Sequence, residues 1–326
     1  MRLIVCAAVL LVLLTLWAGA ALYFDLPFQR GNAPASALYV LLSAALVGWI
    51  RPVRKAVACG FACLAIVLGW WLSLKPSNIR DWQPDVAETA WAEIDKDRVA
   101  IHNVRNSLYR SETDYTPRWE TRNVNVSSIR GADIFITYWG SPWIAHPIMS
   151  FNYGDDEYLA FSIEVRKEKG ESYSAVRGFF RQFELIYIVS DERDVVRLRT
   201  NYRPGEEVYA FRLRATPGAA RALFMEYIHS LNGLRERPEW YNALTTNCTT
   251  DIRRMAVVAV GPNAPAWDWR ILLNGHLDEM LYSQGRLAGD LSLAEMKRRA
   301  HINAVARVYD QAPDFSQRIR SGRPGF

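Results

Sequence analysis

The sequence predicts an α+β protein in which three membrane-spanning helices precede an extracytoplasmic domain with an antiparallel sheet and helices. Three apolar runs, at 3–24, 33–50 and 56–74, come close to the roughly 20 residues that one bilayer crossing requires. Between residues 98 and 213, short segments rich in β-branched and aromatic residues predict strands. Helical patterns follow these strands, which favours the α+β class.

The first apolar run, from Leu3 to Phe24, contains no charged residue. A cleaved signal peptide is the alternative, because Ala18–Gly19–Ala20 resembles a small-residue cleavage site, but both interpretations give the same topology. The loop 51–55 carries three basic residues, and the positive-inside rule places it and the N-terminus in the cytoplasm. We therefore expect a multi-pass protein of the cytoplasmic (inner) membrane whose residues from about 77 onward lie in the periplasm.

Composition and cysteine positions exclude some classes of function. The 326-residue chain has a net charge of +5 and a pI of about 9.0, with no basic run dense enough to predict nucleic-acid binding. Three of its four cysteines lie in apolar segments, so Cys248 has no evident disulfide partner. We predict a membrane domain at 1–76, an extracytoplasmic domain at 77–260 and a C-terminal helical extension at 261–326. The sequence does not predict an oligomeric state.

The extracytoplasmic part is predicted element by element from its hydrophobic patterning. The clearest unit is a hairpin with arms at 143–151 and 158–166, because the second arm alternates apolar and polar residues around a turn at 152–157. The other predicted elements are a short helix near 87–94, strands at 98–109, 118–126, 134–139, 183–190, 195–200 and 207–213, helices at 217–231 and 292–309, and a disordered tail.

Cys248 is a candidate nucleophile. Thr246 and Asn247 are helix-start residues, so Cys248 is expected at the N-terminus of a helix that continues through 252–260. Unpaired N–H groups and the helix dipole at such an end favour a thiolate, which predicts a lowered thiol pKa. The alternative is a small buried hydrophobic residue, as most single cysteines are.

A cysteine nucleophile needs a base and a group that orients the base. Of the five histidines, His146 lies on the first arm of the hairpin, opposite an arm whose polar face bears Ser162 and Glu164. We therefore predict His146 as base and Glu164 as its orienting group, with Ser162 and Asn247 in supporting or oxyanion roles. A structural histidine is the alternative.

Four arginines at 193–203 form a sparse basic cluster. Arg199 and Arg203 are candidate contacts for a lipid headgroup, and a solvated strand edge with local salt bridges is the alternative. Neither Cys-x-x-Cys nor His-x-x-x-His occurs beyond residue 77, so no metal site is predicted.

Several short pieces of the sequence together resemble a bacterial family, the Lnb N-terminal periplasmic domain, long catalogued as a domain of unknown function. The pieces keep their order across about 100–255; they are 103–105, 144–146, 150–151, 162–168, 178–182, 184–187, 191–194, 241–242 and 247–250. The family is named for a lipoprotein N-acyltransferase, and its members look like relatives of NlpC-type papain-like thiol enzymes. The order here, histidine before cysteine, is similar to the permuted order of lecithin:retinol acyltransferase-like enzymes.

The resemblance implies a permuted papain-like fold, with Cys248 and His146 as catalytic residues and Glu164 in support. It implies acyl transfer from a membrane phospholipid, through a cysteine thioester, to an amine such as a lipoprotein N-terminus, without a cofactor. A periplasmic cysteine hydrolase acting on lipid, lipoprotein or cell-wall peptide is the first alternative. The second is a non-catalytic membrane-anchored binding protein. Fold-level likeness alone does not fix the reaction.

Overall fold

The computed structural model describes residues 2–326, with the side chains of residues 2–4 and Gln29 left aside. These residues form two compact units. One contains the chain up to Ser77 together with Ser172–Glu184 and Trp240–Ala243, and the other contains Asn78–Glu171, Leu185–Glu239 and Leu244–Phe326. The predicted domain boundaries at 76 and 260 stay predictions.

The first unit contains three apolar helices, as the sequence predicts: α1 (Arg2–Asp25), α2 (Asn32–Trp49) and α3 (Val53–Ser73). By length and composition all three are candidate membrane spans, over Val5–Asp25, Asn32–Trp49 and Val53–Ser73. At one end of the helices, Asp25 accepts hydrogen bonds from the Trp71 indole (2.7 Å) and the Gln182 amide (2.8 Å). The segment 172–184 is thereby tied to α1 and α3.

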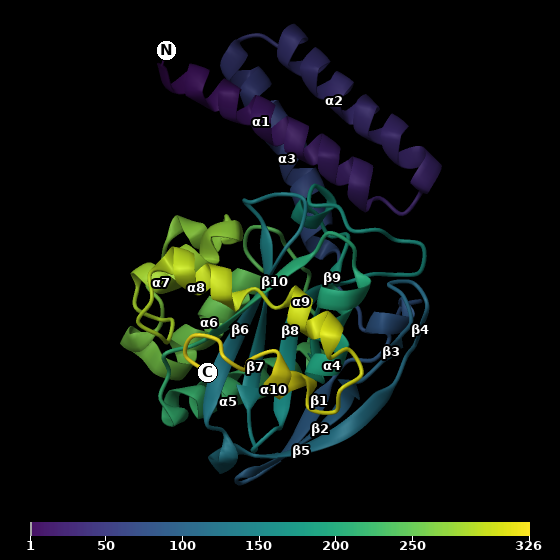
Figure 1. Cartoon of the computed structure of the whole chain (residues 1–326). Helices are drawn as coiled ribbons and strands as arrows, with labels where there is room; N and C mark the ends of the chain where they lie inside the picture. Colours follow the sequence, from purple (N-terminus) through teal and green to yellow (C-terminus); the bar gives the residue numbers. More distant parts are fainter. Residues whose placement is uncertain (1) are drawn as a thin grey trace. The chain divides into compact units, whose positions relative to one another are not determined.

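The second unit is an α+β domain around one large sheet (Figure 1). Its strands are β1 (Trp91–Asp95), β2 (Arg98–Arg105), β5 (Trp119–Asn125), β6 (Gly131–Tyr138), β7 (Ala145–Asn152), β8 (Tyr158–Arg166), β9 (Glu184–Ser190) and β10 (Glu207–Arg212), and a separate pair is formed by β3 (Leu108–Tyr109) and β4 (Tyr115–Thr116). The strand order is β1-β2-β9-β8-β7-β6-β10, with β5 also paired to β2. The pairs β1–β2, β2–β5, β6–β7, β7–β8 and β6–β10 are antiparallel, and β2 and β9 are parallel.

The remaining helices are α4 (Glu192–Arg197), continued by a π-helix η5 (Leu198–Tyr202), α5 (Pro217–Glu236), α6 (Cys248–Val260), α7 (Leu277–Ser283), α8 (Leu293–Ala300), α9 (Asn303–Val308) and α10 (Phe315–Arg318). They cover both faces of the sheet. On one face, Ile148 and Ala160 share a buried core with Val195 of α4 and with Phe315. On the other, the rings of Phe151 and Phe161 pack against Phe224 of α5. Because side chains alternate along a strand, odd and even positions of β7 and β8 face different helices.

The predicted hairpin is confirmed. β7 and β8 pair antiparallel, with Ile148 opposite Ser162 and Asn152 opposite Tyr158. The helices predicted at 217–231 and after Asn247 are present as α5 and α6. Thr216 caps α5 by accepting a hydrogen bond from the Ala219 N–H, and Pro217 occupies the first helical turn, where the sequence signal predicted the start.

Three predictions of local structure are wrong. Residues 91–95 form strand β1 instead of a helix near 87–94, since their backbone pairs antiparallel with β2. The strand predicted at 195–200 is helical, because Asp191 caps α4 by accepting a hydrogen bond from the Arg193 N–H. The C-terminal tail is ordered: Phe315 and Ile319 are fully buried in the core of the sheet domain.

Candidate functional site

Cys248 is the first residue of α6, as the capping signal predicted. The Asn247 side chain accepts from the N–H groups of Thr249 and Thr250 (both 3.0 Å), and Thr250 in turn accepts from the Asn247 N–H (2.9 Å). This reciprocal capping box fixes the start of the helix. The Asn247 side chain, predicted as an oxyanion or supporting group, is therefore occupied in holding the first turn.

The thiol itself is buried, with 8% of the residue exposed. Burial raises the pKa of Cys248 to about 11, and the helix-end N–H groups and the Arg199 charge counter this effect only in part. The predicted lowering of the thiol pKa is therefore wrong for this state of the protein. Loss of hydration outweighs the stabilisation of the thiolate by the helix N-terminus, and Cys248 is a neutral thiol at neutral pH.

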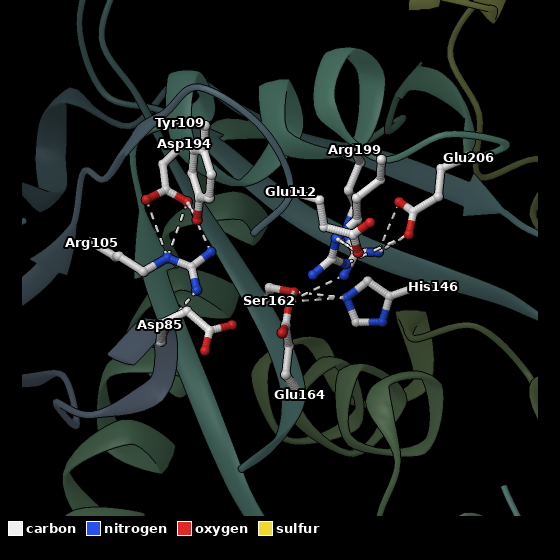
Figure 2. A network of polar contacts seen from close by, with 11 residues as sticks. Asp85, Arg105, Tyr109, Glu112, His146, Ser162, Glu164, Asp194, Arg199 and Glu206 are labelled. Atoms are coloured by element: carbon white, nitrogen blue, oxygen red, sulfur yellow. Dashed lines mark hydrogen bonds and ion pairs between the residues drawn. The ribbon is translucent and has the colours of Figure 1, made fainter. Parts of the chain in front are cut away.

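His146 belongs to a buried polar relay with Ser162, Glu164 and Arg199 (Figure 2). Its Nε2 lies 2.7 Å from the Ser162 hydroxyl, which donates to Glu164 (2.7 Å). Glu164 also accepts from Arg199 at 3.3 Å. Since the Ser162 proton points to the carboxylate, the serine oxygen accepts from His146. The relay therefore selects the tautomer protonated at Nε2 and leaves Nδ1 as the basic nitrogen.

Burial and the positive charge of Arg199 determine which groups of the relay are charged at neutral pH. Loss of hydration and the Arg199 charge together lower the pKa of His146 to about 3, against the opposing effect of Glu164. The pKa of Glu164 is lowered because Arg199, His146 and Arg105 together outweigh its burial. Glu164 is thus an anion and His146 a neutral imidazole at neutral pH. Glu164 reaches His146 mainly through Ser162, since its own oxygen is 3.8 Å from Nε2.

Arg199 and Arg203 were predicted as headgroup contacts. The structure places Arg199 in the interior, where it is 6% exposed and bridges Glu164 and Glu206 (3.1 Å). Arg203 pairs with Glu112 (3.4 Å) and Glu206 (3.6 Å), and its side chain is 22% exposed. Both guanidinium groups are therefore paired with carboxylates of the protein. Arg199 supports the relay instead of facing solvent. The alternative of a solvated strand edge is wrong, because the segment is helical and largely buried.

Asn274 connects the histidine strand to the cysteine helix, and sequence patterning did not indicate it. Its side-chain oxygen accepts from the Ala145 N–H (2.8 Å), beside His146. Its amide nitrogen donates to Thr249 (2.8 Å) and lies 3.7 Å from the Cys248 sulfur. Asn274 follows no helical or strand period, and its partners lie 25 and 129 residues away in the sequence. Its only sequence signal is the pair Asn274–Gly275, which is typical of a turn.

Gly275 allows the loop that carries Asn274 to pack closely against the backbone of residues 142–144. A Cβ atom at Gly275 would lie 2.1 Å from the Pro142 carbonyl oxygen and 2.4 Å from the Trp143 carbonyl carbon. Only glycine allows the two backbones to come this close, and the Gly275 N–H donates to the Trp143 carbonyl (3.0 Å). The segment that leads into His146 is thus held against the segment that carries Asn274.

The structure does not bring all candidates into direct contact. His146, Ser162 and Glu164 share the sheet face of Ile148 and Ala160, which α4 covers. α6 contacts the opposite face, where Met149 of β7 and Ile252 of α6 line a common cavity. Within the described residues, no hydrogen bond joins the His146 ring to the Cys248 thiol. At the end of β7, the Asn274 side chain contacts both the Ala145 N–H and Thr249 of α6.

The three apolar helices and the α+β domain with a buried thiol at a helix N-terminus define a membrane-anchored protein with a candidate thiol site. Residues 115–275 match the family model of the Lnb N-terminal periplasmic domain. The chain is thus a membrane-anchored periplasmic protein. No curated protein and no solved structure matches the chain.

The raised pKa of Cys248 predicts how its rate of chemical labelling depends on pH. Iodoacetamide reacts with the thiolate, so alkylation of Cys248 should accelerate about tenfold per pH unit from pH 7 to 10, toward a pKa of about 11. An ordinary cysteine levels off above its pKa of about 8.5. Peptide mass spectrometry of the full-length protein measures the rate at Cys248, and the urea-unfolded protein is the control. A rate that levels off below pH 8 would show an activated thiol instead.

Proposed function

We propose that this protein is a cysteine acyltransferase of the periplasmic face of the inner membrane, which moves an acyl chain from a phospholipid to an amine through a thioester on Cys248. The observation that carries the proposal is the thiol at the N-terminus of α6, joined through Asn274 to the strand that bears the His146 relay. The match of residues 115–275 to the Lnb N-terminal periplasmic domain supports it. A lipoprotein N-terminus is the acceptor that the family name suggests.

In the first half-reaction the Cys248 sulfur attacks the ester carbonyl carbon of the phospholipid. A C–S bond forms while the ester C–O bond breaks. The thiol proton passes to Nδ1 of His146 after a movement that brings the ring to the thiol, and then to the leaving alkoxide, which departs as the lysophospholipid alcohol. The relay of Ser162 and Glu164 stabilises the imidazolium that forms in between. The Cys248 N–H, at the start of α6, and the Asn274 amide are donors for the oxyanion.

In the second half-reaction an amine nitrogen attacks the thioester. A C–N bond forms, the C–S bond breaks, and His146 carries the amine proton to the departing thiolate, which restores the neutral pair. The two half-reactions balance without an oxidant, a metal or a nucleotide, which suits a compartment without ATP.

The membrane arrangement follows from the loop charges. Arg51, Arg54 and Lys55 lie between α2 and α3, so we place this loop and the N-terminus in the cytoplasm. The domain that follows α3 then lies in the periplasm and works at the surface of the membrane that anchors it.

Intact mass spectrometry tests the proposal. Full-length protein in phospholipid vesicles should gain the mass of one acyl chain, mapped to the peptide that contains Cys248 and released by hydroxylamine. Cys248→Ala should lack this adduct while any acylation of Cys6, Cys59 or Cys63 persists. If wild type and Cys248→Ala show the same adducts, the mechanism loses its intermediate.

Product analysis separates the alternatives. Lysophospholipid together with an acylated peptide amine supports transfer, whereas lysophospholipid with free fatty acid, or a cleaved peptide, supports a hydrolase. Full complementation of a deletion strain by Cys248→Ala would support a non-catalytic binding protein, for which the neutral, buried thiol is the structural argument.

A further inference from the structure

An apolar cavity of about 340 Å³ lies between α5, α6 and the sheet. Its wall is built from Ala220 of α5, Ile252 and Ala256 of α6, Met149 of β7, and Leu277 and Met280 of α7. The volume falls within the roughly 300–1,000 Å³ typical of small-molecule sites. Most of the residues that line it are apolar, which favours a ligand with a large apolar part.

The cavity begins beside the candidate nucleophile. Thr249, Ile252, Arg253, Ala256 and Val260 all line it, and their spacing of three or four residues places them on one stripe of α6. The first of them, Thr249, follows Cys248 directly, with its hydroxyl 3.8 Å from the sulfur. A chain that is esterified at Cys248 therefore has an apolar path along the helix, about 16 Å long from residue 249 to residue 260.

Three arginines add charge to the wall of this cavity: Arg214, Arg253 and Arg286. Arg214 pairs with Asp290 (3.6 Å), and Arg286 donates to the Ala264 carbonyl (3.1 Å). Arg253 is half-buried, and among the described residues no carboxylate lies within ion-pair distance of it. An apolar cavity bordered by basic side chains complements an amphiphile that has a hydrocarbon chain and an anionic group.

We propose that this cavity binds the hydrocarbon chain of the acyl ester that reacts at Cys248, with Arg253 facing the anionic group of the lipid, and that its small residues determine the chain length. The inference rests on the proposed acyl transfer and assigns the acyl-chain site to a defined set of residues. Ala256 and Ala220 are the determining residues, because a larger side chain at either position shortens the cavity.

The first experiment measures chain-length preference. Full-length wild type and Ala256→Phe are incubated with vesicles that contain equal amounts of phosphatidylglycerols with 12-, 14-, 16- and 18-carbon chains, and the adducts at Cys248 are quantified by mass. Each methylene that loses its place in the cavity should lower the yield about fourfold, since one buried methylene corresponds to a factor of about four in affinity. Ala256→Phe should therefore shift to shorter chains.

Ala259→Phe is the matched control, because residue 259 lies on the same helix but does not line the cavity. It should keep the wild-type preference. An unchanged preference in Ala256→Phe would overturn the inference. Ala256→Leu, a smaller change with a smaller expected shift, guards against misfolding, and the iodoacetamide rate of Cys248 reports whether each variant keeps its native site.

A second experiment separates this inference from the proposed function. Cys248→Ala in nanodiscs is photolysed with phosphatidylglycerol that bears a diazirine at the end of one acyl chain. Labelling of the α6 and α7 peptides, and its loss in Cys248→Ala/Ala256→Phe, supports the cavity even if wild type forms no thioester. Labelling that avoids these peptides overturns the cavity even if wild type is acylated. Arg253→Gln should reduce labelling by phosphatidylglycerol more than labelling by its phosphatidylcholine analogue.

Discussion

Replacement of His146 by alanine is expected to slow thioester formation on Cys248 by about 10²–10⁴-fold, the usual contribution of a general base. A thiol with a pKa of about 11 must lose its proton as it attacks, and His146 directly follows Ala145, whose N–H donates to the Asn274 side chain beside the thiol. Ser162→Ala should have a smaller effect, because Glu164 remains 3.8 Å from the ring. The adduct assay measures the rates of wild type, His146→Ala and Ser162→Ala.

The pH profile adds a second readout for His146. Because its pKa is lowered to about 3, the histidine stays unprotonated down to mildly acidic pH. The acylation rate should therefore not fall between pH 8 and 5 through protonation of His146, as it would for a histidine with the ordinary pKa of about 6.5. His229→Ala, an exposed position on α5, is the matched control and should match wild type. An undiminished rate in His146→Ala would remove this residue from the mechanism.

Arg320→Met is expected to destabilise the sheet domain by about 3–5 kcal/mol, a large part of the roughly 5–15 kcal/mol that stabilise a typical domain. Arg320 is 3% exposed and donates to two fully buried carboxylates, Glu192 (2.5 Å) and Asp133 (2.8 Å). Without it, the side-chain partners that remain among the described residues are the Ser150 hydroxyl for Glu192 and Arg212 for Asp133. Buried carboxylates that lose a cationic partner are costly.

Thermal unfolding of the full-length protein, followed by near-ultraviolet circular dichroism, measures this effect. At about 2–4 °C per kcal/mol, the midpoint should fall by roughly 10 °C. Arg318→Met, two residues away at the end of α10, is the control. Arg318 is exposed, pairs with Asp314 and lies over the Tyr309 ring, so its loss should change stability by less than about 1 kcal/mol. Equal midpoints for the two variants would show that the buried network does not stabilise the domain.

Local signals in the sequence predicted the elements that depend on local chemistry. The alternation at 158–166 gave β8, and the capping residues Thr216 and Asn247 gave the starts of α5 and α6. The helix α4 was missed because Val195, Val196 and Leu198 among arginines resemble strand alternation, although Asp191 carried the capping signal. The tail was predicted as disordered because its buried residues are few and its stability comes from Arg320, whose partners are more than 120 residues away.

In the candidate site, too, local signals predicted some residues, whereas others depend on tertiary structure. His146, Ser162 and Glu164 could be grouped because a hairpin brings them together within 18 residues. The hairpin register did not show that Ser162 stands between the ring and the carboxylate, since this depends on rotamers. Arg199 and Asn274 could not be assigned, because no period or spacing links them to the hairpin. The thiol pKa was predicted in the wrong direction because the degree of burial of Cys248 is a tertiary property.

The buried, protonated state of Cys248 also bears on how the protein survives in its compartment. Disulfide exchange and oxidation to sulfenic acid both proceed through the thiolate, and both need access to the sulfur. At a pKa of about 11, only about one thiol in 10⁴ is ionised at neutral pH, and the residue is 8% exposed. The same features that delay deprotonation thus protect an unpaired thiol from periplasmic oxidants.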